Sequence, residues 1–193
     1  MKNRIIYLAA GNSIRYGSNK LLEIIGGKPL YRQCLDELLD IVQENEDYSI
    51  IVVTQYEEIS AYVNSLNADR VKAIISPDSR LGISYSIKAG IRALPKEEGY
   101  DTFIVADQPK LKGETIDGFM KAVMESGMAV GCVCCGSRLG NPTMFRTALE
   151  AELMTLTGDT GGKKIIKAHV DDCFMYEVAG EELWDIDFRE DSV

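Results

Sequence analysis

The sequence predicts an α/β protein with a mostly parallel β-sheet, and two observations lead to this prediction. Short apolar runs, typical of buried strands, alternate with segments in which apolar residues recur every three or four positions, as on one face of a helix. Such alternation is typical of parallel sheets covered by helices. In addition, the first apolar run ends in a loop of Gly, Ser and Asn that carries two cations. In parallel sheets, ligands bind beyond the carboxyl ends of strands, where this loop is expected.

The first half of the chain begins with the apolar run at 5–8, which predicts a buried strand. A turn at Gly26 and Gly27 precedes Pro29, and proline is common at the first position of a helix. Apolar residues then recur at helical spacing to about Asn45. The elements predicted in this half are strands at 5–8, 49–53, 71–75 and 102–106, and helices at 29–45, 57–66 and 82–94.

The second half continues the alternation, and Gly140 and Pro142 predict a break in the chain before Thr143. The elements predicted here are helices at 114–126, 147–154 and 160–168, strands at 128–135 and 173–178, and an acidic tail at 181–191. No linker, internal repeat or low-complexity segment is visible. We therefore expect a single domain spanning residues 1–193.

Composition and charge narrow the class of function. The chain is 46% hydrophobic and 26% charged, which is typical of a globular protein. Its formal net charge is −9, from 21 basic and 30 acidic residues, which argues against nucleic acid or an anionic membrane as a partner. No apolar run approaches the length of a membrane span, and the N-terminus lacks the apolar region of a signal peptide. We therefore expect a cytoplasmic protein.

The five cysteines do not predict a disulfide framework, because their number is odd and they are scattered. Three of them fall at 132–135, where a metal site is one interpretation. The chain has one histidine and no second C-x-x-C pair, so a buried strand at 129–135 is favoured, with cysteine as a small hydrophobe. The single histidine, His169, is expected near a helix end, and Trp184 is expected to pack against the protein interior.

The loop after the first strand has the residues of a phosphate site. Gly11 and Gly17 permit backbone conformations and close approaches that a Cβ would forbid, and successive N–H groups can then line an anion. Arg15 offers a planar fork for phosphate oxygens, and Lys20 a point charge. We expect both cations on an exposed loop. The alternative is an ordinary loop with solvated cations.

The pattern L-A-A-G-x-S-x-R-x-G-x-x-K, from Leu8 to Lys20, resembles the signature loop of the MobA-like nucleotidyltransferases. The resemblance implies a Rossmann-like, three-layer (GT-A-like) nucleotidyltransferase fold with a mostly parallel mixed sheet. It also implies a nucleotide-binding half at about 1–111 and an acceptor-binding half at about 112–193. The nucleotide-binding residues that it implies in this loop are Leu8, Ala9, Ala10, Gly11, Arg15 and Lys20.

The segment from Gly82 to Gly90 resembles the family's G-x-S-x-S-x-x-x-G pattern, in which this segment contacts the nucleotide base. The resemblance assigns base recognition to Ser86, with Ser84 nearby. Small polar residues at a helix start also offer free N–H groups and hydroxyls. The alternative interpretation is a simple helix cap.

Two acidic motifs imply a magnesium site. Ala106-Asp107-Gln108-Pro109 resembles the family's A-D-Q-P, and the segment from Asp185 to Asp191 resembles D-I-D-T-x-E-D, with Phe188 in place of Thr. The resemblance assigns Asp107 and Asp187 as metal ligands. It also assigns Asp107 as a nucleotide-binding residue. Oxygen ligands and substrate phosphates suit Mg²⁺. The alternatives are an aspartate that starts a turn and a solvated acidic tail.

Two further segments are similar to those of molybdenum cofactor cytidylyltransferases. The segment from Arg138 to Phe145 matches R-x-G-x-P-x-x-F, and that from Gly158 to Lys163 matches G-D-x-G-x-R/K. The family often has His where Asn141 stands. The acceptor-binding residues implied are Arg138, Asn141 and Asp159. Two structural turns are the alternative.

The resemblance implies transfer of CMP from CTP to the terminal phosphate of a molybdopterin-type cofactor, with release of pyrophosphate. The catalytic residues implied are Arg15, Lys20 and Asp107, with Mg²⁺ as cofactor and a molybdenum hydroxylase as a possible client of the product. One alternative is a guanylyltransferase on the same acceptor, whose loop more often has L-A-G-G where this chain has Ala10. A sugar- or alditol-phosphate nucleotidyltransferase fits the segment from Arg138 poorly. The alternative from another class is a non-catalytic carrier of the molybdenum cofactor.

Overall fold

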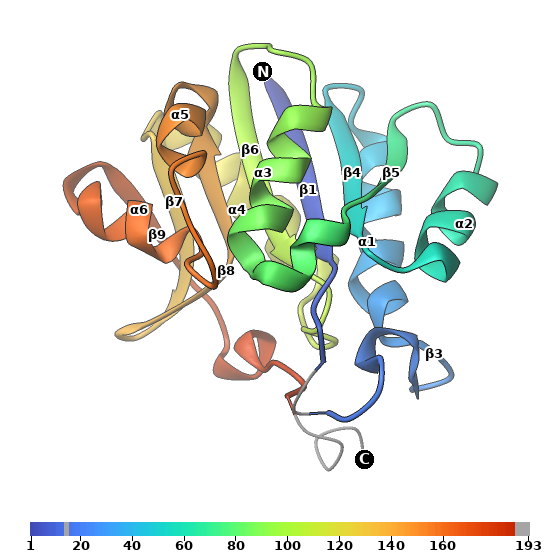
Figure 1. Ribbon diagram of the computed structural model, residues 1–193. Coiled ribbons are helices and arrows are strands. Elements are labelled where there is room, and N and C mark those ends of the chain that lie inside the picture. Colours follow the sequence, from blue (N-terminus) through green and yellow to red (C-terminus); the bar gives the residue numbers. More distant parts are fainter. Residues whose placement is uncertain (14–15, 188–193) are drawn as a thin grey trace.

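The computed structural model describes residues 1–13 and 16–187 and shows an α/β protein (Figure 1). Its main sheet has seven strands in the order β5-β4-β1-β6-β8-β7-β9, and β2 and β3 form a separate hairpin. The strands are β1 (Lys2–Ala9), β2 (Ile24–Ile25), β3 (Lys28–Pro29), β4 (Tyr48–Thr54), β5 (Val71–Ile75), β6 (Gly99–Val105), β7 (Val130–Cys135), β8 (Arg138–Arg146) and β9 (Cys173–Glu177). The α-helices are α1 (Leu30–Glu44), α2 (Glu57–Ser65), α3 (Ile83–Ala93), α4 (Gly113–Ser126), α5 (Glu150–Leu153) and α6 (Lys163–Ala168). The predicted α/β fold with a mostly parallel mixed sheet is confirmed.

The direction of winding changes beside the first strand. β4 and β5 lie on one side of β1, β6 lies on the other, and all four strands are parallel. β8 is antiparallel to both of its neighbours, β6 and β7, and β9 runs parallel to β7. Sheets of this type bind ligands where the strand order reverses, outside the carboxyl ends of the strands. In this chain that place is between β1 and β6.

Helices cover both faces of the sheet, because the side chains of each central strand alternate between two apolar clusters. Ile5 and Tyr7 of β1 belong to a cluster that also holds the buried side chains of α1, α2 and α4. Ile6 and Leu8 belong to the opposite cluster, with α3, α5 and α6. Figure 1 shows α3 in front of the sheet and α1 behind it. The result is a three-layer fold, as expected.

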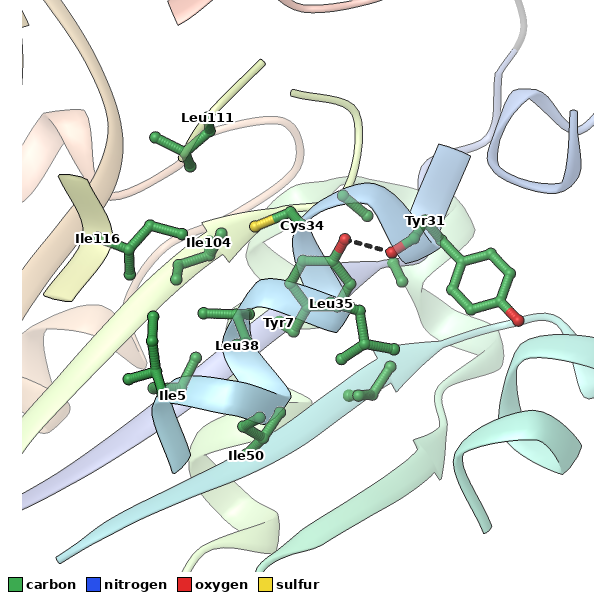
Figure 2. Packing of buried hydrophobic residues seen from close by; sticks show 14 of the residues in the cluster. Ile5, Tyr7, Tyr31, Cys34, Leu35, Leu38, Ile50, Ile104, Leu111 and Ile116 are labelled. Carbon is green, nitrogen blue, oxygen red and sulfur yellow. Dashed lines mark hydrogen bonds between the residues drawn. The ribbon is translucent and has the colours of Figure 1, made fainter. Parts of the chain in front are cut away.

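The first cluster is centred on Tyr7, which is fully buried between β1 and α1 (Figure 2). Its ring packs beside Cys34 and Leu35, and its hydroxyl donates to the carbonyl oxygen of Tyr31 at 2.7 Å. A buried hydroxyl needs such a partner. This contact fixes the end of β1 from which the glycine loop departs against the start of α1.

The predicted break at Gly140 is wrong, because β8 continues through it. The Asn141–Pro142 peptide bond is cis, and the register between β7 and β8 shifts between Cys132 and Cys134. Proline has no N–H to donate to a strand ladder and is therefore found at such irregular pairings. Asn141 is thus a strand residue rather than part of a turn between elements.

The last third of the chain departs from the predicted helix bounds. The helix predicted at 147–154 is a 3₁₀ turn, Thr147–Leu149, followed by α5, and α6 begins at Lys163 rather than at residue 160. The predicted acidic tail is not solvated as far as residue 187. It forms the 3₁₀ turn Gly180–Leu183, and Leu183 and Ile186 are buried at 1% and 0% exposure. These apolar side chains, spaced three apart, hold the segment on the protein.

Within residues 1–13 and 16–187, no helix combines the length and apolar character needed to cross a membrane.

Candidate functional site

Two adjoining cavities lie at the carboxyl ends of β1 and β6, where the sheet order predicts a ligand site. The first has a volume of about 110 Å³, and the second of about 230 Å³. Both are lined by Leu8, Ile83 and Asp159, so they share a wall. The two cavities therefore adjoin, one at the glycine loop and the other at the region predicted to bind an acceptor.

The first cavity brings together several of the residues predicted to bind a nucleotide. Those that line it are Leu8, Ala10, Gly11, Ser86 and Asp107. Ala9 does not, because it points to the opposite face of the sheet and is fully buried in the first apolar cluster. Arg15 lies outside the described residues.

The loop at 10–12 is held from the side of β4. Gln55 donates its Nε2 hydrogens to the carbonyl oxygen of Ala10 at 2.8 Å and to Oδ1 of Asn12 at 3.0 Å. The hydroxyl of Tyr56 donates to the carbonyl oxygen of Gly11 at 2.6 Å. Asn12 in turn donates to the carbonyl oxygen of Arg80 at 2.8 Å, so the loop is fixed on both sides of the cleft.

The two loop glycines have different structural roles. Gly17 has a φ of +81°, which a side chain would disfavour. Gly11 does not have positive φ, and no described atom lies within 4 Å of the position that its Cβ would occupy. Gly17 therefore has the backbone conformation for which glycine was expected. At Gly11, the missing side chain instead leaves open space on the cavity wall.

The start of α3 forms another wall of the first cavity. Gly82 has a φ of +130°, and a Cβ there would lie 2.3 Å from the carbonyl carbon of Gly158. This contact brings the loop that carries Asp159 against the helix start. Ser86 shares a 2.8 Å hydrogen bond with Ser79, whose side chain also lines the cavity. Ser84 is fully buried, does not line the cavity, and its Oγ has no hydrogen-bond partner among the described residues.

Lys20 is buried, at 7% exposure, so the prediction that it lies on an exposed loop is wrong. Its Nζ donates to Asp107 Oδ2 at 2.8 Å and to the carbonyl oxygen of Ile186 at 2.6 Å. Asp187 Oδ1 lies 3.8 Å from the same nitrogen. A buried ammonium is unfavourable unless it is paired and hydrogen-bonded, and these oxygens supply its partners.

Asp107 and Asp187 face the same ammonium from two distant segments. Their side chains are 25% and 48% exposed, so water and ligands can reach both. Mg²⁺ takes one or two protein carboxylates and completes its shell with water and substrate phosphates, so this pair of oxygen donors fits it. In residues 1–13 and 16–187, no group of three or more His, Cys, Asp or Glu side chains could hold a metal.

A third carboxylate, Asp185, lies beside this pair and accepts a hydrogen bond from Gln108 Nε2 at 2.8 Å. Burial raises the pKa of the Asp185 carboxyl, and the negative charge of Asp107 raises it further. The backbone N–H of Ile186 donates to the carbonyl oxygen of Asp107 at 3.0 Å. The segment at 185–187 is thus attached to the chain just after β6.

The second cavity contains two of the three residues predicted to bind an acceptor. Asn141 and Asp159 line it, together with Thr143 and Lys163. Arg138 does not line it, and its guanidinium donates to the carbonyl oxygen of Leu183 at 2.7 Å. Arg138 therefore holds the C-terminal segment in this structure.

Gln55 and Tyr56 were not singled out by the sequence, although they contact the glycine loop. A signal for them exists. They directly follow β4, which is parallel to β1, so they fall at the same edge of the sheet as the loop. Polar residues that directly follow a parallel strand can therefore indicate a site, as glycine motifs do.

Comparisons with known proteins identify a family and a fold. The family model of the MobA-like NTP transferase domain matches residues 5–173. The bifunctional protein GlmU of Rubrobacter xylanophilus is 23% identical over 155 residues, which are 79% of this chain. The chain spans only 31% of the length of that relative.

Solved structures share the fold at low sequence identity. Rv0371c of Mycobacterium tuberculosis H37Rv has a TM-score of 0.79 at 18% identity, with coverage of 99% of this chain and 95% of that one. A structure of Rv0371c in complex with manganese gives a TM-score of 0.77 at 19% identity, covering 99% and 96% of the two chains. The molybdopterin-guanine dinucleotide biosynthesis protein A of Archaeoglobus fulgidus gives 0.68 at 16% identity, covering 99% and 94%.

The fold, the position of the cleft and the span of the family match lead to one assignment. The structural likeness establishes the Rossmann-like nucleotidyltransferase fold, and the family match covers most of the chain. Nucleotidyl transfer is the activity of this kind of domain. The protein belongs to the family of MobA-like NTP transferase domains.

Proposed function

We propose that the protein transfers CMP from CTP to the terminal phosphate of a molybdopterin-type cofactor and releases pyrophosphate. One observation carries the proposal: the two cavities adjoin at Leu8, Ile83 and Asp159, and Asp107 lies on the wall of the first. Two adjoining cavities suit a reaction in which two substrates must meet end to end. The first cavity would take the nucleotide and the second the acceptor.

The choice of CTP over GTP rests on Ala10. The methyl group of Ala10 belongs to the wall of the smaller cavity, where glycine would leave more room. A narrower site favours a pyrimidine over a purine. The pattern L-A-A-G, which resembles that of the cytidylyltransferases, supports the same choice. Ser79 and Ser86 supply hydroxyls on the same wall that could bond to the edge of a base.

The choice of acceptor rests on the second cavity. Asn141, Thr143 and Asp159 offer hydrogen-bond groups, and Lys163 offers a positive charge for a phosphate. The side chains of Ile87 and Phe103 provide apolar surface for a ring system. This combination suits a phosphorylated heterocycle.

The chemistry requires alignment and charge neutralisation rather than a general base. A phosphate monoester has a second pKa of about 6, so at neutral pH it is mostly dianionic and attacks without losing a proton. The loop at 10–12 and Lys163 would hold the two phosphates in line. Asp107 and Asp187 would hold Mg²⁺, which supplies stabilisation of charge on the transferred phosphate when it is bound. In the ligand-free protein, Lys20 keeps these two carboxylates together.

The proposal is tested by nucleotide-dependent thermal stabilisation with Mg²⁺. CTP should raise the melting temperature more than GTP, ATP or UTP at equal concentration, because binding to the folded state stabilises it. A larger shift with GTP would replace the proposal by a guanylyltransferase on the same acceptor. Release of pyrophosphate from CTP in the presence of the cofactor separates an enzyme from a cofactor carrier, which has no use for a triphosphate site.

A further inference from the structure

We propose that Gln55 and Tyr56 are positioning residues that aim the backbone N–H groups of Gly11 and Asn12 at the phosphates of the bound nucleotide. The proposal rests on the proposed function only in that the first cavity takes a nucleoside triphosphate. It does not depend on which base or which acceptor the enzyme uses.

Two neighbouring carbonyl groups of the loop point toward the segment that follows β4. The carbonyl of Ala10 points to Gln55 Nε2 at 2.8 Å, and that of Gly11 points to the hydroxyl of Tyr56 at 2.6 Å. Both side chains come from the same short segment after β4. Two consecutive peptide units of the loop are therefore turned toward one side.

The planarity of the peptide bond then determines where the N–H groups of the same two peptide units point. In a trans peptide, the C=O of one residue and the N–H of the next point in opposite directions. The peptide bonds at 10–11 and 11–12 are not among the cis bonds of the structure. The N–H groups of Gly11 and Asn12 must therefore point away from Gln55 and Tyr56.

The residues around these two N–H groups form a wall of the first cavity. Ala10, Gly11 and Asn12 line the first cavity, and Gly11 adds no side chain to it. Among the described residues, neither N–H has a protein hydrogen-bond partner. Two adjacent N–H donors that face a cavity bind an anion well, since each would otherwise remain unsatisfied.

The side chains of Gln55 and Tyr56 can hold this arrangement at neutral pH. Burial raises the pKa of the Tyr56 hydroxyl, so it remains protonated and donates. Gln55 also donates to Asn12 Oδ1 at 3.0 Å, and Asn12 donates to the carbonyl oxygen of Arg80. The loop is thus fixed against rotation about its peptide units, which reduces the ordering that binding would require.

Gln55→Met and Tyr56→Phe test the proposal, because each keeps the size of the side chain and removes the donor. Inorganic tripolyphosphate, CTP and GTP, each with Mg²⁺, are titrated by calorimetry into the wild type and the variants. Each variant should bind all three anions about three- to tenfold more weakly, because each loses one hydrogen bond to the loop carbonyl that it orients. The ratio of CTP to GTP affinity should not change, since the effect acts on the phosphates.

Tyr62→Phe is the matched control. Tyr62 lies within α2 and packs edge-on against the ring of Tyr31. It should bind the three anions like the wild type. The melting temperature of each ligand-free variant shows that it is folded, and Tyr56→Phe alone is sufficient should Gln55→Met fail to fold.

The outcomes separate this inference from the proposed function. A wild type that prefers GTP refutes the cytidylyl assignment but leaves the expected loss of tripolyphosphate binding in place. Unchanged tripolyphosphate affinity in both variants, an equal loss in Tyr62→Phe, or a changed CTP to GTP ratio would each overturn the inference. Failure of the wild type to bind tripolyphosphate at all would overturn it as well.

Discussion

Replacing Lys20 by methionine should destabilise the ligand-free protein and make it more responsive to divalent metal ions. The ammonium of Lys20 lies 2.8 Å from Asp107 Oδ2 and 3.8 Å from Asp187 Oδ1. Methionine fills a similar volume but carries no charge. The two carboxylates then face each other without a cation between them.

The size of the effect follows from burial. Removing one partner of a fully buried ion pair costs about 3–5 kcal/mol. Here Lys20 is buried, but the carboxylates are 25% and 48% exposed, so water screens much of the remaining charge. We therefore expect a loss of about 1–2 kcal/mol, the lower part of the range for a charge left without its partner. For a chain of this size that corresponds to a fall in melting temperature of about 2–8 °C.

Differential scanning fluorimetry with and without millimolar Mg²⁺ or Mn²⁺ measures both parts of the prediction. A divalent ion should stabilise the Lys20→Met variant more than the wild type, because in the wild type the ammonium already compensates the carboxylates. Lys121→Met is the control, since Lys121 pairs with Asp117 on an exposed helix face and such pairs contribute little. Equal stabilisation of wild type and Lys20→Met by the metal would refute the view that Lys20 stands where a metal ion would.

Other variants test the remaining contacts. Gly82→Ala should lower the melting temperature by several degrees, because φ is +130° and the added Cβ would lie 2.3 Å from Gly158; a change of less than one degree would contradict this. Asp107→Asn should abolish metal-dependent pyrophosphate release while the protein stays folded by circular dichroism, and retained turnover would remove Asp107 from the metal site. Burial raises the pKa of the Asp101 carboxyl to about 7, so folding favours its protonated form. The stability that this protonated form contributes is lost as pH rises from about 4 toward 7. Urea unfolding at pH 5 and pH 7.5 should show a smaller loss of stability with pH for Asp101→Asn than for the wild type, and equal losses would contradict the shift.

The parts of the fold that the sequence predicts well are those encoded by local pattern. The apolar run that ends at Leu8 predicts β1. The glycine loop and Asp107 each follow a predicted strand, so the carboxyl-end rule places both at one edge of the sheet. Both follow from side-chain alternation and strand direction. The structure confirms this shared edge, since Ala10, Gly11 and Asp107 line one cavity.

Predictions failed where a local pattern was overridden by a distant partner. Lys20 stands among Gly, Ser and Asn residues that predict an exposed loop, yet it is buried by contacts with Asp107 and Ile186. Pro142 predicts a break, yet the pairing of β8 with its neighbours carries the strand through it. Local propensity is a weak prior when tertiary contacts are available.

The contacts that complete the site join positions far apart in the chain. Lys20 and Ile186 are 166 residues apart, and Gln55 and Ala10 are 45 apart. Each pair forms only once the strand order has brought its two segments to the same edge, so the local pattern around one segment does not reveal its partner. The same order explains how the ligand-free fold tolerates Asp107 and Asp187 side by side. Two carboxylates without a cation would repel, and one would be driven to protonate. In the ligand-free fold, the ammonium of Lys20 offsets this repulsion.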